Sequence, residues 1–255
     1  MIARSSIAFA LALILAAALP VEAARRRLVV RPAAGAPQPE LVVVQDDFRF
    51  GPLGWEAGFA DYSPVNGDME LVAEIRPLPP EIAPTGTAFF LQGHNRSDDL
   101  FMFLKKKLTV ADGIRPGQRY EATFRIVFDS NAGNGDACAG IGGAPGASLY
   151  LKAGVSGEEP RVVLDDSDHW RMTVDKGNQS TSGPAGSVVG TIENGTSRCD
   201  SEAPFVRLIK MHRHPWLVSA SPVGELWVLV GTDSGFEGLT RIYYESIEVT
   251  LRPVP

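Results

Sequence analysis

The chain has 255 residues, a formal net charge of -6 at pH 7 and two cysteines. This length suits one large domain or two small ones. Its dense basic clusters are three arginines at 25–27 and three lysines at 105–107. The lysines fit a solvated strand end that discourages edge pairing. The chain therefore lacks the basic face that nucleic acids bind, and we exclude a nucleic-acid partner.

Residues 1–23 have the pattern of a secretory signal peptide. Arg4 precedes an apolar run at 7–19, and the segment ending at Ala23 fits a small-residue cleavage site. The run is short for a membrane span, although the arginines at 25–27 would also suit an uncleaved anchor. Because the run is alanine-rich, as in bacterial signals, we expect a secreted or periplasmic bacterial protein. Once the signal is cleaved, no stable membrane span remains.

Residues 24–39 are basic and then rich in proline and alanine, which predicts a flexible leader. From residue 40 to residue 255 no internal repeat or break in composition appears, so we expect one domain there. Within it, short segments of strand character are separated by Gly, Pro, Asn and Asp. We predict strands near 41–44, 69–75, 87–91, 100–110, 118–129, 148–155, 161–164, 169–175, 187–192 and 205–212.

The alternation of apolar and polar residues is clearest in 118–129. One face there carries Tyr120, Ala122, Phe124, Ile126 and Phe128, a period of two that indicates a strand. Residues 100–104 are apolar on both faces, as in a strand that is covered on both sides. Many short strands without helices predict an all-β, antiparallel sandwich or barrel.

Residues 225–252 predict a closing pair of strands joined as a hairpin around Asp233 and Gly235. Glu245 breaks the pattern of the second strand, because it has the parity of Ile247 and Val249. A regular strand would point this carboxylate at the core, which is costly unless the group is paired or bound to a metal. A β-bulge at Glu245 is the alternative, and it would turn the side chain toward water.

Both ends of the domain resemble those of the jelly-roll, galactose-binding-like carbohydrate-binding modules. The matching residues are Asp46, Asp47, Phe48, Gly54 and Trp55 at the front and Glu245 and Ile247 at the back. The resemblance implies a single jelly-roll sandwich in which the first and last strands lie close together. It also implies a structural calcium ion held by Asp46, Asp47 and Glu245, although the family usually has Asp where this chain has Glu245.

Two cysteines allow only one disulfide, between Cys138 and Cys199, and an exported chain favours its formation. In the chain-entropy model, closing a loop of about sixty residues stabilises a fold by roughly 4 kcal/mol.

Four other residues are candidate ligand contacts. His212 and His214 are two apart, so on a strand they share a face; a metal site there would need a third ligand. Pro215 ends any such strand, which favours two edge histidines instead. Trp170 and Trp216 could stack on a sugar ring, although Trp170 also fits a core position beside Met172.

We therefore expect an exported domain that binds a glycan without catalysis, with calcium as its one possible cofactor. A lectin-like hydrolase or lyase acting through Asp165, Asp166 or Asp168 is the second hypothesis, because paired carboxylates can cleave glycosidic bonds. A structural sandwich without a small ligand is the third. Exposure of the four tryptophans along one face would favour sugar binding, and burial of all four would favour the structural hypothesis.

Overall fold

The computed structural model describes residues 40–255, except for 97–98, 136–137, 139–143 and 201. Pro39–Pro255 form one compact unit. The predicted signal peptide (1–23) and leader (24–39) lie outside the described residues and stay predictions. Within the described residues, no helix has the length and apolar character needed to cross a membrane.

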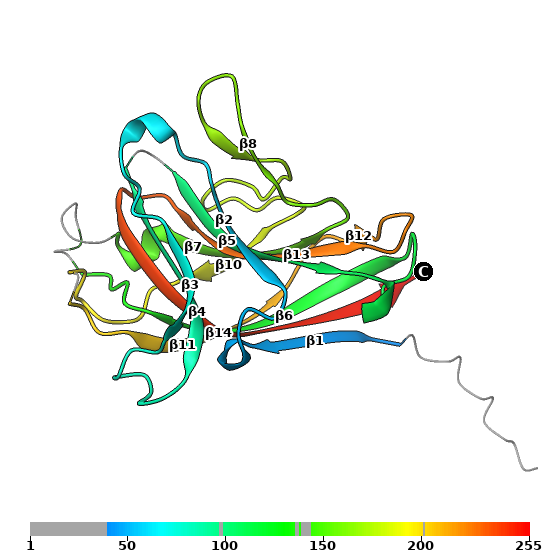
Figure 1. The fold of residues 1–255 in the computed structure, drawn as a ribbon, viewed down its shortest axis with the longest axis horizontal. Coiled ribbons are helices and arrows are strands. Elements are labelled where there is room, and N and C mark those ends of the chain that lie inside the picture. Colours follow the sequence, from blue (N-terminus) through cyan, green and yellow to red (C-terminus); the bar gives the residue numbers. More distant parts are fainter. Residues whose placement is uncertain (1–39, 97–98, 136–137, 139–143, 201) are drawn as a thin grey trace, which may run out of the picture. The chain divides into compact units, whose positions relative to one another are not determined.

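Two antiparallel sheets, here named A and B, form the sandwich that the sequence predicted (Figure 1). Sheet A consists of β1 (Val42–Asp47), β3 (Val72–Pro77), β4 (Thr87–Asn95), β6 (Arg119–Ser130), β11 (Val206–Arg213), β12 (Val218–Ser219) and β14 (Gly238–Val254). Sheet B consists of β2 (Trp55–Ala60), β5 (Leu100–Leu108), β7 (Leu149–Ser156), β10 (Ser187–Thr191) and β13 (Leu226–Ser234). A small hairpin of β8 (Val162–Leu164) and β9 (Trp170–Met172) projects from the sandwich (Figure 1).

Alternating side chains of both sheets fill the core between them. Phe124, Ile126 and Phe128 of β6 lie in it together with Val228 and Val230 of β13. All five are at most 1% exposed. This confirms the face predicted for 118–129. The apolar segment 100–104 lies in β5, and all five of its residues are buried.

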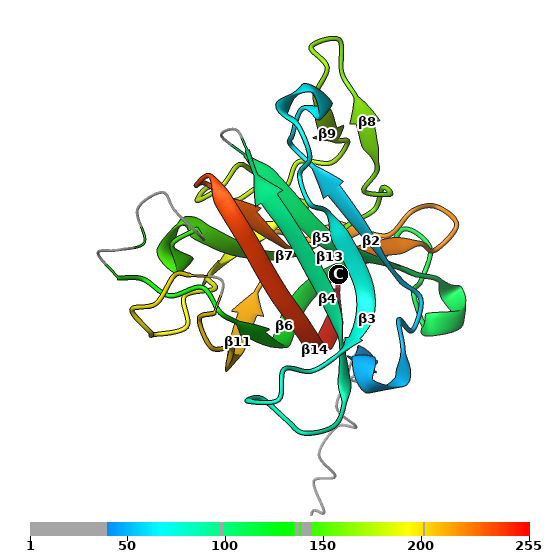
Figure 2. The same ribbon diagram turned by 60° about the vertical axis from the view of Figure 1, so that its left-hand side comes forward.

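β14 is the longest strand and organises sheet A. One of its edges pairs with β6 along most of its length, while the other pairs first with β4 and then with β1. Figure 2 shows β14, β4 and β3 side by side in this sheet. The first and last strands therefore pair directly, as the resemblance to the jelly-roll modules implied.

A β-bulge interrupts β14 between Tyr244 and Ser246, which confirms the bulge that the sequence offered as the alternative to an inward Glu245. The extra residue changes the parity of the buried positions. Ile242 and Tyr244 face the core before the bulge, and Ile247 faces it after the bulge. The side chain of Glu245 retains 18% exposure and lies on the other side of the sheet.

The prediction that β13 and β14 form a hairpin is wrong. β13 pairs with β5 and β7 in sheet B, whereas β14 lies in sheet A. The short connection 235–237 crosses from one sheet to the other. Strand alternation does not distinguish these two arrangements, because each half of such a pair has one buried face in either case.

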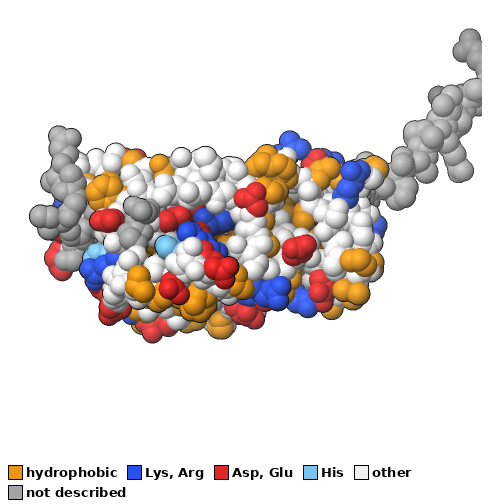
Figure 3. All heavy atoms as spheres, turned by 90° about the horizontal axis from the view of Figure 1, so that it is seen from above, with side chains coloured by type: hydrophobic (Ala, Val, Ile, Leu, Met, Phe, Trp, Pro, Cys, Tyr) orange, Lys and Arg blue, Asp and Glu red, His pale blue; other side chains and the backbone are white. Residues whose placement is uncertain are grey.

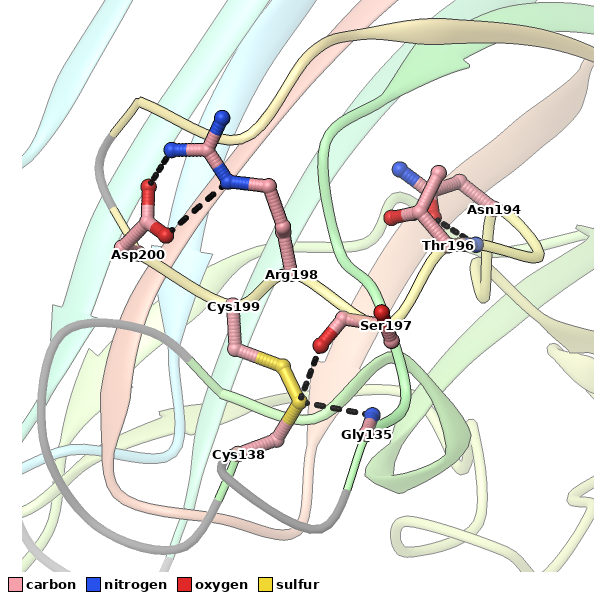
Figure 4. The surroundings of a disulfide bond; sticks show 8 residues. All are labelled: Gly135, Cys138, Asn194, Thr196, Ser197, Arg198, Cys199 and Asp200. Atoms are coloured by element: carbon pink, nitrogen blue, oxygen red, sulfur yellow. Dashed lines mark hydrogen bonds and ion pairs between the residues drawn. A yellow bond between two sulfur atoms is a disulfide. The ribbon is translucent and has the colours of Figure 1, made fainter.

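The structure contains the predicted disulfide between Cys138 and Cys199 (Figure 4). It joins the segment after β6 to the segment before β11, and the two Cα atoms are 5.2 Å apart. The backbone N–H of Gly135 lies 2.9 Å from Sγ of Cys138, and Arg198 pairs with Asp200 beside the bridge.

Replacing Ile242 by Ala tests the bulge. Ile242 is fully buried, so Ile242→Ala should lower the free energy of unfolding by about 2 to 5 kcal/mol in chemical denaturation. Thr250→Ala, on the same strand but facing away from the core, should cost less than about 1 kcal/mol. Equal effects of the two substitutions would contradict the bulged register.

Candidate functional site

The outer face of sheet B carries an apolar patch. Phe101 and Phe103 of β5 stack there with ring centroids 5.3 Å apart, next to Leu229 of β13. Val162 and Met172 of the β8–β9 hairpin pack against this patch from above. The hairpin therefore covers part of a sheet face that would otherwise be solvated.

Two lysines and three aspartates adjoin the patch and form what we call the lysine–aspartate cluster: Asp61, Asp99, Lys152, Lys176 and Asp233. Lys152 and Asp233 are completely buried, with Nζ 3.1 Å from Oδ2. Lys152 also donates to the carbonyl oxygens of Lys176 at 2.9 Å and of Thr181 at 2.7 Å. These bonds fasten the segment after β9 onto sheet B.

Lys176 connects two of the carboxylates. Its Nζ lies 2.8 Å from Oδ2 of Asp233 and 2.7 Å from Oδ2 of Asp61, and 4.7 Å from the centroid of the Phe101 ring. Burial alone would lower the pKa of Lys176, but the two carboxylates raise it overall. Lys176 therefore stays a cation.

Asp99 has the opposite tendency. Burial, followed by the negative charge of Asp233, raises the pKa of Asp99 to about 8. The Oδ1 atoms of Asp99 and Asp233 are both buried, and neither accepts a hydrogen bond from an N–H group. A proton on Asp99 satisfies both, because the protonated acid donates to Asp233.

A pocket of about 340 Å³ opens beside the cluster. It is lined by Asp61, Asp99, Arg171, Met172, Val174, Asp175, Lys176, Gly177 and Asn178. Acidic and basic side chains are interspersed over the face toward which the hairpin projects, without a continuous patch of one sign (Figure 3). The lining of the pocket is mostly polar, and its two apolar side chains are Met172 and Val174.

The carboxylates of Asp61, Asp99 and Asp233 are close enough to hold a metal ion, with one oxygen from each within 4.8 Å of the others. Oxygen ligands of this kind suit a hard cation such as Ca²⁺. Lys176, however, already donates to Asp61 and Asp233. An ammonium group thus supplies positive charge where a metal ion would otherwise do so.

The carboxylates predicted to bind calcium each have their own cationic partner. Asp46 accepts from Nζ of Lys106 at 2.7 Å and from the Trp55 indole at 2.8 Å, while Asp47 pairs with Arg49 at 2.6 Å. Glu245 is not grouped with them: Arg207 contacts both of its oxygens. The calcium site at Asp46, Asp47 and Glu245 stays a prediction without support from this geometry.

Glu245 also lies next to another acidic residue, Asp129 of β6. Burial and the Glu245 carboxylate raise the pKa of Asp129 to about 7, with Arg207 acting in the opposite direction. The two acids and the arginine thus form a compact group on the outer side of sheet A. The bulge places Glu245 in this group.

His212 and His214 share a face, as predicted, and both contact one hydroxyl. Oγ of Ser187 lies 2.6 Å from Nε2 of His212 and 2.8 Å from Nδ1 of His214. Nε2 of His214 lies 3.0 Å from the Pro184 carbonyl, which can only accept, so this nitrogen carries the hydrogen. Both nitrogens of His214 are thus occupied, and the group ties β11 of sheet A to β10 of sheet B.

The four tryptophans do not share one groove. Trp55 is buried in the core, Trp227 lies on the outer face of sheet B between Lys105 and Lys107, and Trp170 is half-buried in β9. Trp216, which is 37% exposed, packs beside His214. No tryptophan lines the pocket beside the cluster. Sugar stacking by Trp170 or Trp216 stays a prediction.

The acidic segment after β8 forms a hydrogen-bonded turn. Asp165 accepts from the backbone N–H groups of Ser167 and His169, which lower its pKa together with Arg171. Asp166 and Asp168 are exposed in the same turn. This arrangement gives no support to hydrolysis or lysis through these three residues.

The cluster itself was missed in the sequence. Lys152 and Asp233 have the outward parity of their strands, which predicts exposure. They are buried because 173–186 crosses over them, and that segment has no periodicity from which its position could be predicted. A lysine between apolar neighbours in 149–155 was the one available signal.

No protein-family model matches the chain, and no curated protein matches it. Among solved structures it is similar to TmCBM61 in complex with β-1,4-galactotriose, at 8% identity and TM-score 0.35, over 80% of this chain and 92% of that one. It is also similar to the C-terminal family 22 carbohydrate-binding module of Clostridium thermocellum Xyn10B, at 12% identity and TM-score 0.34, over 82% and 93%.

A third match is the enzymatically active domain of bacteriophage CBA120 tailspike protein 4, at 9% identity and TM-score 0.34. It covers 79% of this chain but only 20% of that one. Carbohydrate-binding modules recur among the matched structures. TM-scores this low assign no ligand to the chain.

The two histidines predict acid sensitivity. Burial lowers the pKa of His214. Burial, followed by the charge of the neighbouring His214, lowers the pKa of His212, so the fold favours the neutral form of both histidines. Their contribution to stability is present above the unfolded pKa of 6.5 and is lost as the pH falls below it. Denaturant unfolding at pH 7.5 and pH 5 detects this loss when a histidine variant is compared with the wild type, because the raised pKa values of Asp99 and Asp129 stabilise the fold over the same pH range in both proteins.

His212→Asn removes part of this loss, so its change in stability from pH 7.5 to pH 5 should be more favourable than that of the wild type. His169→Gln, which alters a histidine of the β8–β9 turn, should give the same change as the wild type. An identical change in the wild type and His212→Asn would exclude His212 as a cause of acid sensitivity.

Proposed function

We propose that the chain is an exported, non-catalytic domain that binds a glycan in the pocket beside the lysine–aspartate cluster. The observation that supports this most directly is the composition of the pocket wall. Arg171 and Asn178 offer several N–H donors, Asp175 offers acceptors, and Met172 and Val174 offer apolar contact. A sugar presents hydroxyl groups around apolar C–H faces and needs this mixture.

The charges of the cluster also favour a neutral ligand. Lys176 compensates Asp61 and Asp233, and Asp99 holds its proton near neutral pH because its pKa is raised to about 8. The pocket therefore offers hydrogen-bonding groups without a large excess of either sign. A neutral polyol satisfies such groups at a lower desolvation cost than an ion does.

Replacing Arg171 by Ala tests the pocket. After a glycan array has identified a ligand for the wild type, isothermal titration should show at least a tenfold weaker Kd for Arg171→Ala, since hydrogen bonds to a charged group contribute about 1.5 to 3 kcal/mol. Arg252→Ala is the matched control, because Arg252 is also about half exposed and its partner Glu121 keeps Arg213. Its Kd should equal that of the wild type.

Binding to no glycan on a broad array would contradict the proposal as a whole. Unchanged binding by Arg171→Ala would move the site elsewhere, and Trp216→Ala and Trp170→Ala would then test the two predicted stacking residues. Release of reducing sugar from the bound polysaccharide would favour the hydrolase hypothesis instead.

Chelation tests the structural calcium ion that the family resemblance implied. Both candidate groups, the aspartates of the cluster and the set Asp46, Asp47 and Glu245, already have lysine or arginine partners. We therefore expect the melting temperature to be the same in excess chelator and in millimolar CaCl₂. A lower melting temperature in chelator, reversed by added calcium, would show that one of these groups binds the ion.

A further inference from the structure

The side chains of Lys152 and Asp233 lie close enough to react with each other. They lie on neighbouring strands, β7 and β13, with Nζ 3.1 Å from Oδ2 and both side chains fully buried. A buried ion pair is costly to desolvate and adds little to stability compared with apolar residues. We propose that these two side chains condense to an intramolecular amide, an isopeptide bond that links β7 to β13. This inference does not depend on the proposed glycan binding.

The surroundings of Lys152 favour a nucleophilic amine. Burial lowers the pKa of Lys152, which makes the neutral form accessible. A neutral amine has two N–H groups and one lone pair. The carbonyl oxygens of Lys176 and Thr181 accept the two N–H groups, so the lone pair is left on the side of the Asp233 carboxyl group.

Asp233 starts as a carboxylate: burial alone would raise its pKa, but Lys176 and Lys152 lower it overall. A carboxylate resists attack, and it must gain a proton before one oxygen can leave. Asp99 can supply that proton, because its protonated form donates to Asp233. Lys176, 2.8 Å from Oδ2, stays positively charged and stabilises the negative oxygen that forms during attack.

The reaction balances without any other reagent. Nζ of Lys152 attacks Cγ of Asp233, the N–C bond forms, and one Cγ–O bond breaks. Asp99 gives its proton to the Asp233 carboxylate and regains one from the Lys152 ammonium, which leaves the neutral amine that attacks. The oxygen leaves as water with the proton that Asp99 supplied and one proton from the attacking nitrogen. The amide nitrogen keeps one hydrogen, and Asp99 ends as it began.

Proximity and dryness favour the product. Groups held in a reactive arrangement reach effective concentrations of about 10⁵ to 10⁸ M. The Phe101 ring and the covering segment restrict water around the pair, which slows hydrolysis of the amide. An amide also removes two buried charges at once.

Intact-mass spectrometry of the folded wild-type protein, reduced at its disulfide, tests the proposal. The mass should be lower than that of the sequence by one water molecule. Tryptic digestion should give one peptide pair that joins Asp233 to Lys152, with no cleavage after Lys152. A full mass in the folded protein overturns the proposal, and a pair joined through Lys176 overturns the choice of nucleophile.

Asp99→Asn separates the reaction from folding, because it removes the proton donor while keeping the shape of the side chain. The folded variant should have the full mass calculated from its sequence, with no water lost. Lys107→Met is the matched control, since Lys107 forms an exposed ion pair with Glu225 on the same sheet. This variant should show the same loss of one water molecule as the wild type, and a loss of water in Asp99→Asn would exclude Asp99 from the reaction.

Discussion

The bulge at Glu245 is the constraint on which sheet A and its share of the core depend. β14 must bury apolar residues along its whole length, because it borders β4, β1 and β6. A strand with strict alternation would send either Ile242 or Ile247 to the wrong face. One extra residue resolves this conflict, and the displaced carboxylate pairs with Arg207 instead of facing the core.

The lysine–aspartate cluster has a similar role on the opposite side of the sandwich. Segment 173–186 crosses the outer face of sheet B and contains no strand, so strand pairing does not hold it there. Lys152 and Asp233 hold this segment through its backbone. Lys152 donates to the carbonyl oxygen of Thr181, and Asp233 accepts from the N–H group of Gln179. The pocket exists because this segment is fixed, so the buried charges position the polar wall that faces solvent.

Strand alternation was sufficient to predict the class of fold, the face of β6 and the buried nature of β5. It could not predict which sheet each strand joins, because β13 and β14 have the same pattern in a hairpin as in a crossing between sheets. The disulfide followed from a count of two cysteines. The cluster could not be predicted, since Lys152 and Asp233 are buried by a segment whose path depends on those same residues.

Burial raises the pKa of one acid in each of the two acidic groups. On sheet A, the fully buried Asp129 has its pKa raised to about 7, and the partly exposed Arg207 compensates the charge that Asp129 shares with Glu245. Asp99 and Asp233 are enclosed with two lysines, and enclosure raises the pKa of one acid while it lowers that of Lys152. The same enclosure makes the pocket wall nearly neutral and brings an amine against a carboxyl group. Both proposals for sheet B therefore follow from one physical cause, the removal of these charges from water.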